Sequence, residues 1–207
     1  YDRADALQLY ATYTSLVYLA PVAGGYLADK WLGKRRAVLI GAIVMAMGHF
    51  AMAIPSLLIF ALGLLIIGNG FFKPNLATLV GGLYGDNDPR RDGGFTIYYM
   101  GVNLGAFIAP LICGLLGERF GWHYGFGAAG VGMVIGVITF AVGQKMLGTL
   151  GFPPGREVTE RSSLSARDWT TIAVTSVLMI ALVYVVLLGW NLLNPAQFGI
   201  TPFTACL

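Results

Sequence analysis

Long apolar stretches dominate this sequence and leave little room for a soluble fold. A membrane-spanning helix needs about 20 mostly apolar residues, and it satisfies its backbone hydrogen bonds within itself. We expect such helices at Leu7–Ala28, Ala37–Ile54, Leu57–Gly81, Phe95–Gly117, Gly125–Val142 and Trp169–Trp190. The sequence therefore predicts an all-α, polytopic transmembrane helix bundle.

The composition agrees with a membrane bundle. Charged residues make up only 11% of the chain, against about 25% in a typical soluble domain. The 29 glycines suit closely packed membrane helices. The cysteines, Cys113 and Cys206, and the histidines, His49 and His123, show no metal-ligand spacing. We therefore expect no metal, no cofactor and no enzymatic activity, and we expect His49 to be a packing residue.

The distribution of positive charge predicts how the helices are oriented. The connections on one side of the membrane carry Lys30, Lys34, Arg35, Arg36, Arg90, Arg91, Lys145, Arg156, Arg161 and Arg167. The opposite side carries only Arg3 and Arg119. Because Lys and Arg accumulate in cytoplasmic loops, the first side is expected to be cytoplasmic and residue 1 to lie outside.

The chain divides into three expected parts. Residues 1–147 form a bundle of membrane helices, residues 148–168 form a cytoplasmic linker, and residues 169–207 hold an additional membrane helix and the end of the chain. The linker assignment rests on Pro153-Pro154-Gly155 and the polar residues that follow. A first helix that starts outside predicts a preceding membrane helix, so we expect a piece of a longer protein.

The segment Gly25–Arg36 joins the first two expected spans and combines an acid with a basic cluster. Asp29 lies at the end of one span, and Lys34, Arg35 and Arg36 lie at the start of the next. Such a cluster can bridge neighbouring helices at a closed cytoplasmic face, which predicts a gating role for Asp29, Arg35 and Arg36. The alternative is a loop that only sets topology, which requires Lys and Arg alone.

Two of the polar residues inside the apolar spans are candidates for function. Lys73, in the run Gly68–Asn75, lies well within the third span, where an ammonium needs water or a partner. Asn103 lies near the middle of the fourth span, between Gly101 and Gly105, which form a small-residue face suited to close packing. Both are candidate ligand-binding residues. Snorkelling of Lys73 and an interhelical hydrogen bond from Asn103 are the alternatives.

Tyrosines follow one face of the first span. Tyr10, Thr14 and Tyr18 recur at intervals of four residues and therefore share a helix face. Tyrosine offers both apolar bulk and a hydroxyl, which suits a site for varied substrates. Ordinary helix packing is the alternative for Tyr10 and Tyr18.

These segments together resemble the proton-dependent oligopeptide transporter (POT/PTR) family of the major facilitator superfamily, in its bacterial branch. The Asp29 segment is similar to the loop after the superfamily's second helix, and Lys73-Pro74-Asn75 matches the Lys-Pro-Asn of the family's fourth helix. The run Tyr98–Gly105 is a conservative variant of the fifth-helix signature, and Leu16–Pro21 resembles the second helix.

The resemblance implies a fold and a function. The fold would be family helices 2–6 of the amino-terminal bundle plus one extra linker helix, without the first helix and its Glu-x-x-Glu-Arg motif. The function would be proton-coupled symport of di- and tripeptides across the bacterial inner membrane by alternating access. Its partners would be small peptides, protons and the lipid bilayer, with no nucleic acid. The alternative is a major facilitator that carries another small solute, such as a drug or a sugar.

The resemblance also assigns roles to residues. Tyr10, Tyr18, Lys73 and Asn103 would bind the peptide, and Lys73 would also take part in proton coupling. The proton gradient would drive transport without a cofactor. The last span, Trp169–Trp190, lacks an acidic residue and looks like one of the extra helices of bacterial members, so we expect it to be peripheral.

Overall fold

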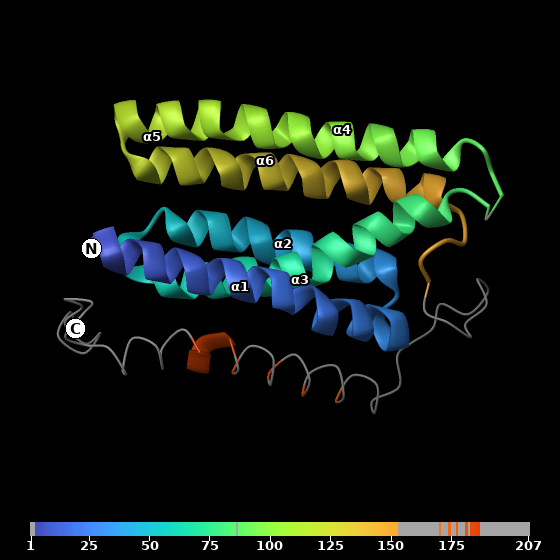
Figure 1. Ribbon diagram of the computed structural model, residues 1–207, viewed down its shortest axis with the longest axis horizontal. Coiled ribbons are helices and arrows are strands. Elements are labelled where there is room, and N and C mark those ends of the chain that lie inside the picture. The colour runs from blue at the N-terminus through green and yellow to red at the C-terminus, as the bar shows by residue number, and fades with distance from the viewer. Residues whose placement is uncertain are drawn as a thin grey trace.

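The computed structural model describes residues 3–85, 87–152, 170, 174, 177, 181 and 183–186, and its regular elements are all helical (Figure 1). In chain order they are α1 (Arg3–Leu27), η1 (Ala28–Leu32), α2 (Lys34–Met52), η2 (Pro55–Leu57), α3 (Leu58–Gly82), α4 (Arg91–Ala109), η3 (Pro110–Gly114), α5 (Leu115–Phe120), α6 (Trp122–Gly143) and η4 (Gln144–Leu147). The prediction of an all-α bundle is confirmed.

The first five expected spans form helices close to their predicted bounds. Four helical segments of the described chain are long and apolar enough to cross a membrane: Lys34–Met52, Pro55–Gly82, Arg91–Phe120 and Trp122–Leu147. Helix α1 has 25 residues, a length of about 38 Å, but Tyr, Thr, Ser and Gly make it less apolar than these four. The expected span Trp169–Trp190 lies largely outside the described residues, and so do residues 153–168 of the expected linker 148–168.

Tight turns separate the helices at two glycines. Gly33, between η1 and α2, has φ 75°, and Gly121, between α5 and α6, has φ 109°. Both values lie in the region that residues with a Cβ rarely adopt. The chain therefore reverses sharply at these points, and neighbouring helices run antiparallel.

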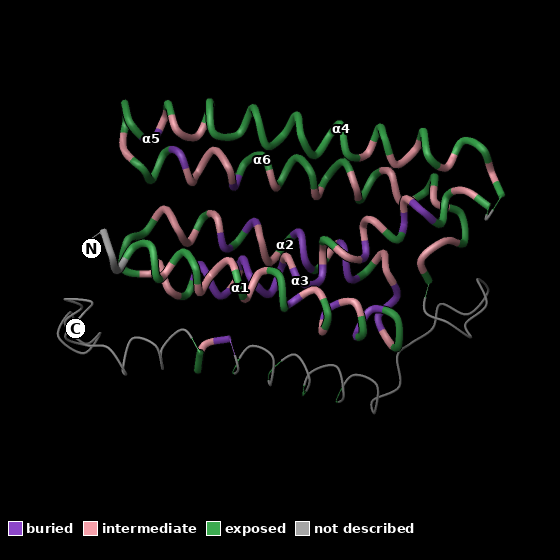
Figure 2. The backbone as a smooth tube through the Cα atoms, in the orientation of Figure 1, coloured by how far each residue is buried: buried purple, intermediate pink, exposed green. Residues whose placement is uncertain are grey.

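Helix α3 is the centre of the bundle. It lies against α1 and α2, and about half of it is buried, whereas α4 and α6 are largely exposed (Figures 1 and 2). Ile66 is fully buried and packs with Ala20 of α1. A helix that is apolar on all sides is expected at the core of a bundle. The exposed apolar faces of α4 and α6 suit contact with lipid.

Glycines set the distance between the three central helices. A Cβ on Gly24 of α1 would lie 2.2 Å from the carbonyl oxygen of Gly70 in α3. A Cβ on Gly41 of α2 would lie 2.6 Å from the carbonyl oxygen of Gly68. These distances are shorter than any real contact of a Cβ, so both crossings require glycine. Small residues at helix crossings are what membrane bundles use for close packing.

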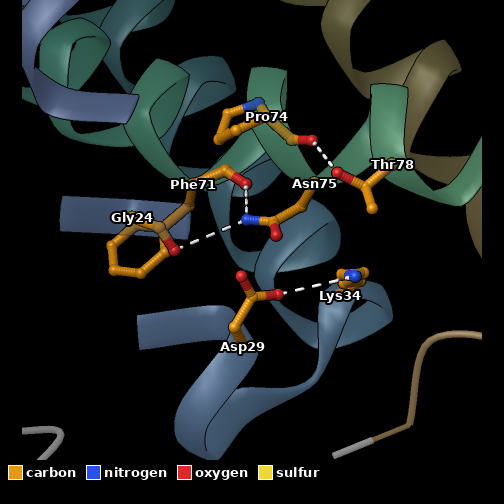
Figure 3. A network of polar contacts seen from close by, with 7 residues as sticks. All are labelled: Gly24, Asp29, Lys34, Phe71, Pro74, Asn75 and Thr78. Atoms are coloured by element: carbon orange, nitrogen blue, oxygen red, sulfur yellow. Dashed lines mark hydrogen bonds and ion pairs between the residues drawn. The ribbon is translucent and has the colours of Figure 1, made fainter. Parts of the chain in front are cut away.

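Pro74 and Asn75 complete the crossing of α1 and α3. Pro74 has no amide hydrogen, so the carbonyl of Gly70, four residues earlier, lacks its usual helical donor, and it lies against Gly24 of α1. Asn75 is 1% exposed. Its side-chain nitrogen donates to the carbonyl of Phe71 at 2.8 Å and approaches that of Gly24 at 3.5 Å (Figure 3). We call the crossing of α1 and α3 at Pro74 the Pro74 joint. It is a tightly packed crossing, in which backbone carbonyls accept hydrogen bonds from the buried Asn75 side-chain amide.

The predicted close packing at Gly101 and Gly105 is not seen in the described part of the chain. A Cβ at either position would meet nothing within 4 Å. Helix α4 approaches α3 near one end only, where Phe95 lies against Gly81 and Gly94 lies against Tyr84. The face that holds both glycines is therefore open.

Candidate functional site

Lys73 and Tyr18 meet on the exposed side of the crossing between α1 and α3. The Lys73 Nζ lies 5.0 Å from the centroid of the Tyr18 ring, which is within the range of a cation–π contact. Both residues are exposed, and Tyr18 keeps 69% of its accessible surface. The structure thus brings together two residues that the sequence analysis assigned to one site from different helices.

No carboxylate pairs with Lys73 in the part of the chain that the structure describes. The ion pairs formed there are Asp29–Lys34 and Asp88–Arg90. The Tyr18 ring attracts the ammonium but does not cancel its positive charge. The charge of Lys73 is therefore not neutralised by a carboxylate of the described residues.

Three other polar residues of α1 and α3 have different surroundings. Tyr10 is 67% exposed, so its ring is available for contact. Thr14 donates to the carbonyl of Tyr10 within the helix, at 2.7 Å. Asn69 of α3 donates to the carbonyl of Val17 at 3.1 Å and joins the two helices beside Tyr18. The stripe of Tyr10 and Tyr18 thus lies on an accessible face of α1.

Asn103 lies on another helix at a similar depth. It is exposed on α4, and no contact joins it to Lys73 in the described structure. Lys73 precedes Gly81 by eight residues, and Asn103 follows Phe95 by eight. Because Phe95 lies against Gly81, both polar residues are about 12 Å along their helices from this crossing. A cavity shared by Lys73 and Asn103 stays a prediction.

Asp29 and Lys34 lie at the end of the bundle where three connections meet. Asp29 sits in the π-helical turn η1, and its carboxylate pairs with Lys34 at 3.5 Å across Gly33 (Figure 3). Among the described residues, this pair links the turn that follows α1 to the first residue of α2 and contacts no third helix. It borders a cavity of about 530 Å³. The polar side chains that line this cavity are Asp29, Lys34, Thr78, Tyr84 and Arg91.

Arg35 and Arg36 have different environments. Arg35 binds backbone carbonyls in the segment that follows η4, whereas Arg36 is exposed at the surface. The gating roles of Asp29, Arg35 and Arg36 stay predictions.

In the connection 83–90, hydrogen bonds from Arg90 lower the pKa of the Asp88 carboxyl to about 2, so this acid stays charged.

His49 borders a second cavity, at the other end of the bundle. This cavity has a volume of about 620 Å³ and an almost entirely apolar lining, which includes Tyr10, Tyr13, Leu62 and Phe126. The Nδ1 atom of His49 is buried, and no partner for it exists among the described residues. The histidine therefore faces the interior, as a packing residue would.

The sequence analysis missed the structural role of Asn75 and of the glycines at the central crossings. Asn75 was named only as part of a motif, although a polar amide in an apolar span raises the same question that was asked of Asn103. The first three expected spans contain Gly24, Gly41, Gly68 and Gly70, and the spacing of these glycines shows no clear repeat. Only the pairing of the helices shows which glycines face each other.

A comparison with protein families decides the assignment. A model described as the POT family matches residues 35–187. The chain belongs to the POT family. Its helices form part of a multi-pass membrane protein with the major facilitator fold, as the sequence predicted. The match includes the Lys73 and Asn103 segments and α2 to α6.

Curated relatives point in the same direction. The chain is 38% identical over 203 residues to a di-/tripeptide transporter of Lactococcus lactis subsp. lactis, which covers 95% of this chain and 39% of the relative. It is 40% identical over 183 residues to the uncharacterized transporter YclF of Bacillus subtilis, covering 86% of this chain and 37% of the relative. The chain therefore spans less than two fifths of the length of these relatives.

Solved structures of POT proteins share the fold. A peptide transporter POT in complex with sulfate matches with a TM-score of 0.75 and 38% identity, over 94% of this chain and 39% of that chain. A POT family transporter in complex with 5-aminolevulinic acid matches with a TM-score of 0.75 and 34% identity, over 90% of this chain and 38% of that chain.

Proposed function

We propose that this chain is part of a proton-coupled symporter that carries di- and tripeptides across the bacterial inner membrane by alternating access. Two bundles of helices would rock about a central site and expose it to each side in turn. The proton gradient would drive uptake without a cofactor. Family membership and the di-/tripeptide transporters among the relatives support this proposal.

The observation that carries the proposal is the Lys73 ammonium, exposed beside Tyr18 and without a carboxylate partner in the described chain. A peptide brings a carboxylate that this ammonium attracts. Tyr10, Tyr18 and Asn103 offer hydroxyl and amide groups to the peptide backbone. In proton coupling, Lys73 would exchange between the substrate and an acidic side chain in the remainder of the transporter.

Peptide uptake by the full-length transporter in proteoliposomes tests this function. With an inside-alkaline pH gradient, we expect a labelled dipeptide to accumulate and an uncoupler to stop its accumulation. Unlabelled di- and tripeptides should compete, whereas glucose should not. Competition by glucose, or uptake that the uncoupler leaves unchanged, would favour the alternative of another small solute or another energy source.

Cysteine labelling tests the proposed orientation. In a background that lacks Cys113 and Cys206, Asn87→Cys should react with an impermeant thiol reagent only from the cytoplasm, and Ser56→Cys only from outside. Both positions are exposed, and they lie in connections at opposite ends of α3. Lys and Arg gather around the Asn87 end, which is the physical reason for the expected direction. Labelling in the reverse pattern overturns the orientation.

A further inference from the structure

The segment Gly148–Phe152, through which the chain leaves η4, is bound to the start of α2. We call it the exit segment. The Arg35 side chain donates two hydrogen bonds to it, from Nη2 to the carbonyl of Gly148 at 2.6 Å and from Nε to the carbonyl of Leu150. The backbone nitrogen of Arg35 donates to the carbonyl of Gly151 at 3.3 Å. The guanidinium also lies 4.5 Å from the centroid of the Phe152 ring.

The exit segment is shaped to fit this place. Gly148 and Gly151 have φ values of 54° and 83°, which favour glycine. A Cβ on Gly151 would lie 2.6 Å from Leu79 of α3 and 3.0 Å from the Arg35 side chain. A Cβ on Gly82 would meet Leu150 at 2.6 Å. The segment is therefore packed tightly against the end of α3 and does not merely pass over it.

The position of Arg35 argues for a specific role. It lies in the first turn of α2, where the positive end of the helix dipole disfavours a cation. Carbonyl oxygens of the exit segment offset that cost, and the planar guanidinium suits two acceptors at once. A loop that only sets topology needs none of these contacts. Arg36, the next residue, carries the same charge and is exposed.

We propose that Arg35 is a positioning residue that fastens the exit segment to the cytoplasmic ends of α2 and α3, so that the start of the linker moves with this bundle during transport. Leu150, Gly151 and Phe152 form one side of the cavity that Asp29 and Lys34 also line. Arg35 thereby holds the wall of that cavity in place. The transport consequence rests on the proposed function, whereas the contact itself does not.

Hydrogen exchange in the purified full-length protein tests the contact without any substrate. In Arg35→Gln, the backbone amides of residue 35 and of Leu150, which donate to the carbonyls of Gly151 and Leu147, should exchange roughly tenfold faster, because loss of the guanidinium contacts frees the exit segment. Arg35→Lys should fall between the wild type and Arg35→Gln, because an ammonium lacks the planar fork. Arg36→Gln is the matched control and should exchange like the wild type. Unchanged exchange in Arg35→Gln overturns the proposal.

Gly151→Ala tests the same contact from the other side. The added methyl group would displace Leu79 or Arg35, so this variant should also expose the exit segment while all charges stay in place. Wild-type exchange at the amides of Arg35 and Leu150 in Gly151→Ala would contradict the packing on which the proposal rests. This variant decides the matter if Arg35→Gln does not fold.

Transport kinetics separate positioning from structure alone. Both Arg35→Gln and Gly151→Ala should lower the turnover rate of peptide uptake several-fold and leave KM unchanged, because the exit segment lies away from Lys73 and Tyr18. Lys145→Gln, at an exposed cation in η4 without an assigned role, should leave both values unchanged. Faster exchange with normal turnover, or equal slowing by Arg35→Gln and Lys145→Gln, overturns the positioning role. If the wild-type protein carries no peptide, the proposed function is wrong, and hydrogen exchange alone then tests the contact between Arg35 and the exit segment.

Discussion

Replacement of Lys73 by alanine is expected to lower proton-driven peptide uptake by about 10- to 100-fold, the factor that follows from losing a charge-assisted hydrogen bond. Lys73 is exposed in the structure, and its ammonium lies over the Tyr18 ring. The substitution therefore removes a charge without opening a cavity in the core. Expression level and membrane insertion should stay near those of the wild type.

Lys73→Arg separates charge from geometry. It keeps the positive charge but replaces a compact ammonium with a broad planar group, so we expect uptake well below the wild-type rate. Lys145 provides a matched control, because it is an exposed cation in the last turn of η4, outside the site. Lys145→Ala should transport normally. Wild-type uptake in Lys73→Ala would mean that Lys73 merely snorkels to the interface.

Gly24→Ala is expected to destabilise the bundle by about 1–3 kcal/mol, the usual cost of overpacking a filled core. Its Cβ would meet the backbone of Gly70 and Phe71, and backbone cannot swing aside as a flexible side chain does. The change should therefore force α1 and α3 apart at the Pro74 joint. It should also shift Tyr18 relative to Lys73, because these residues lie on the two helices that separate.

The neighbouring glycine supplies the control for that experiment. A Cβ on Gly25 would lie 3.8 Å from Pro74, an ordinary van der Waals contact. Gly25→Ala should therefore be neutral, or stabilising by up to about 1 kcal/mol through its better helix propensity. Thermal unfolding of the two variants in the same detergent measures the difference. Equal melting temperatures would contradict the proposed crossing.

Most of the fold could be predicted from the sequence because a bilayer restricts what a chain can do. Long, mostly apolar stretches such as Leu58–Gly82 must form helices, and glycine or proline at positions such as Gly33, Gly121 and Pro55 marks where they end. These features depend on local sequence and on the membrane. The family resemblance assigned Lys73 and Tyr18 to one site, and in the structure the two side chains meet.

The remaining features depend on which helices meet. Nothing local distinguishes Gly24, which touches the backbone of α3, from Gly101, which faces open space. Arg35 and Arg36 are adjacent and carry the same charge, yet only Arg35 binds the exit segment. That segment lies more than 100 residues away along the chain. Such long-range contacts are set by the packing of the whole bundle and have no short-range signal.

Peptide-induced proton uptake tests the central claim most directly, because it measures coupling and substrate in one signal. Proteoliposomes that contain the full-length transporter and a trapped pH-sensitive dye should acidify inside when a dipeptide is added outside. The same vesicles with Lys73→Ala should show little acidification at equal protein content. Acidification that is equal in the Lys73→Ala variant, or absent from the wild type, would contradict the account.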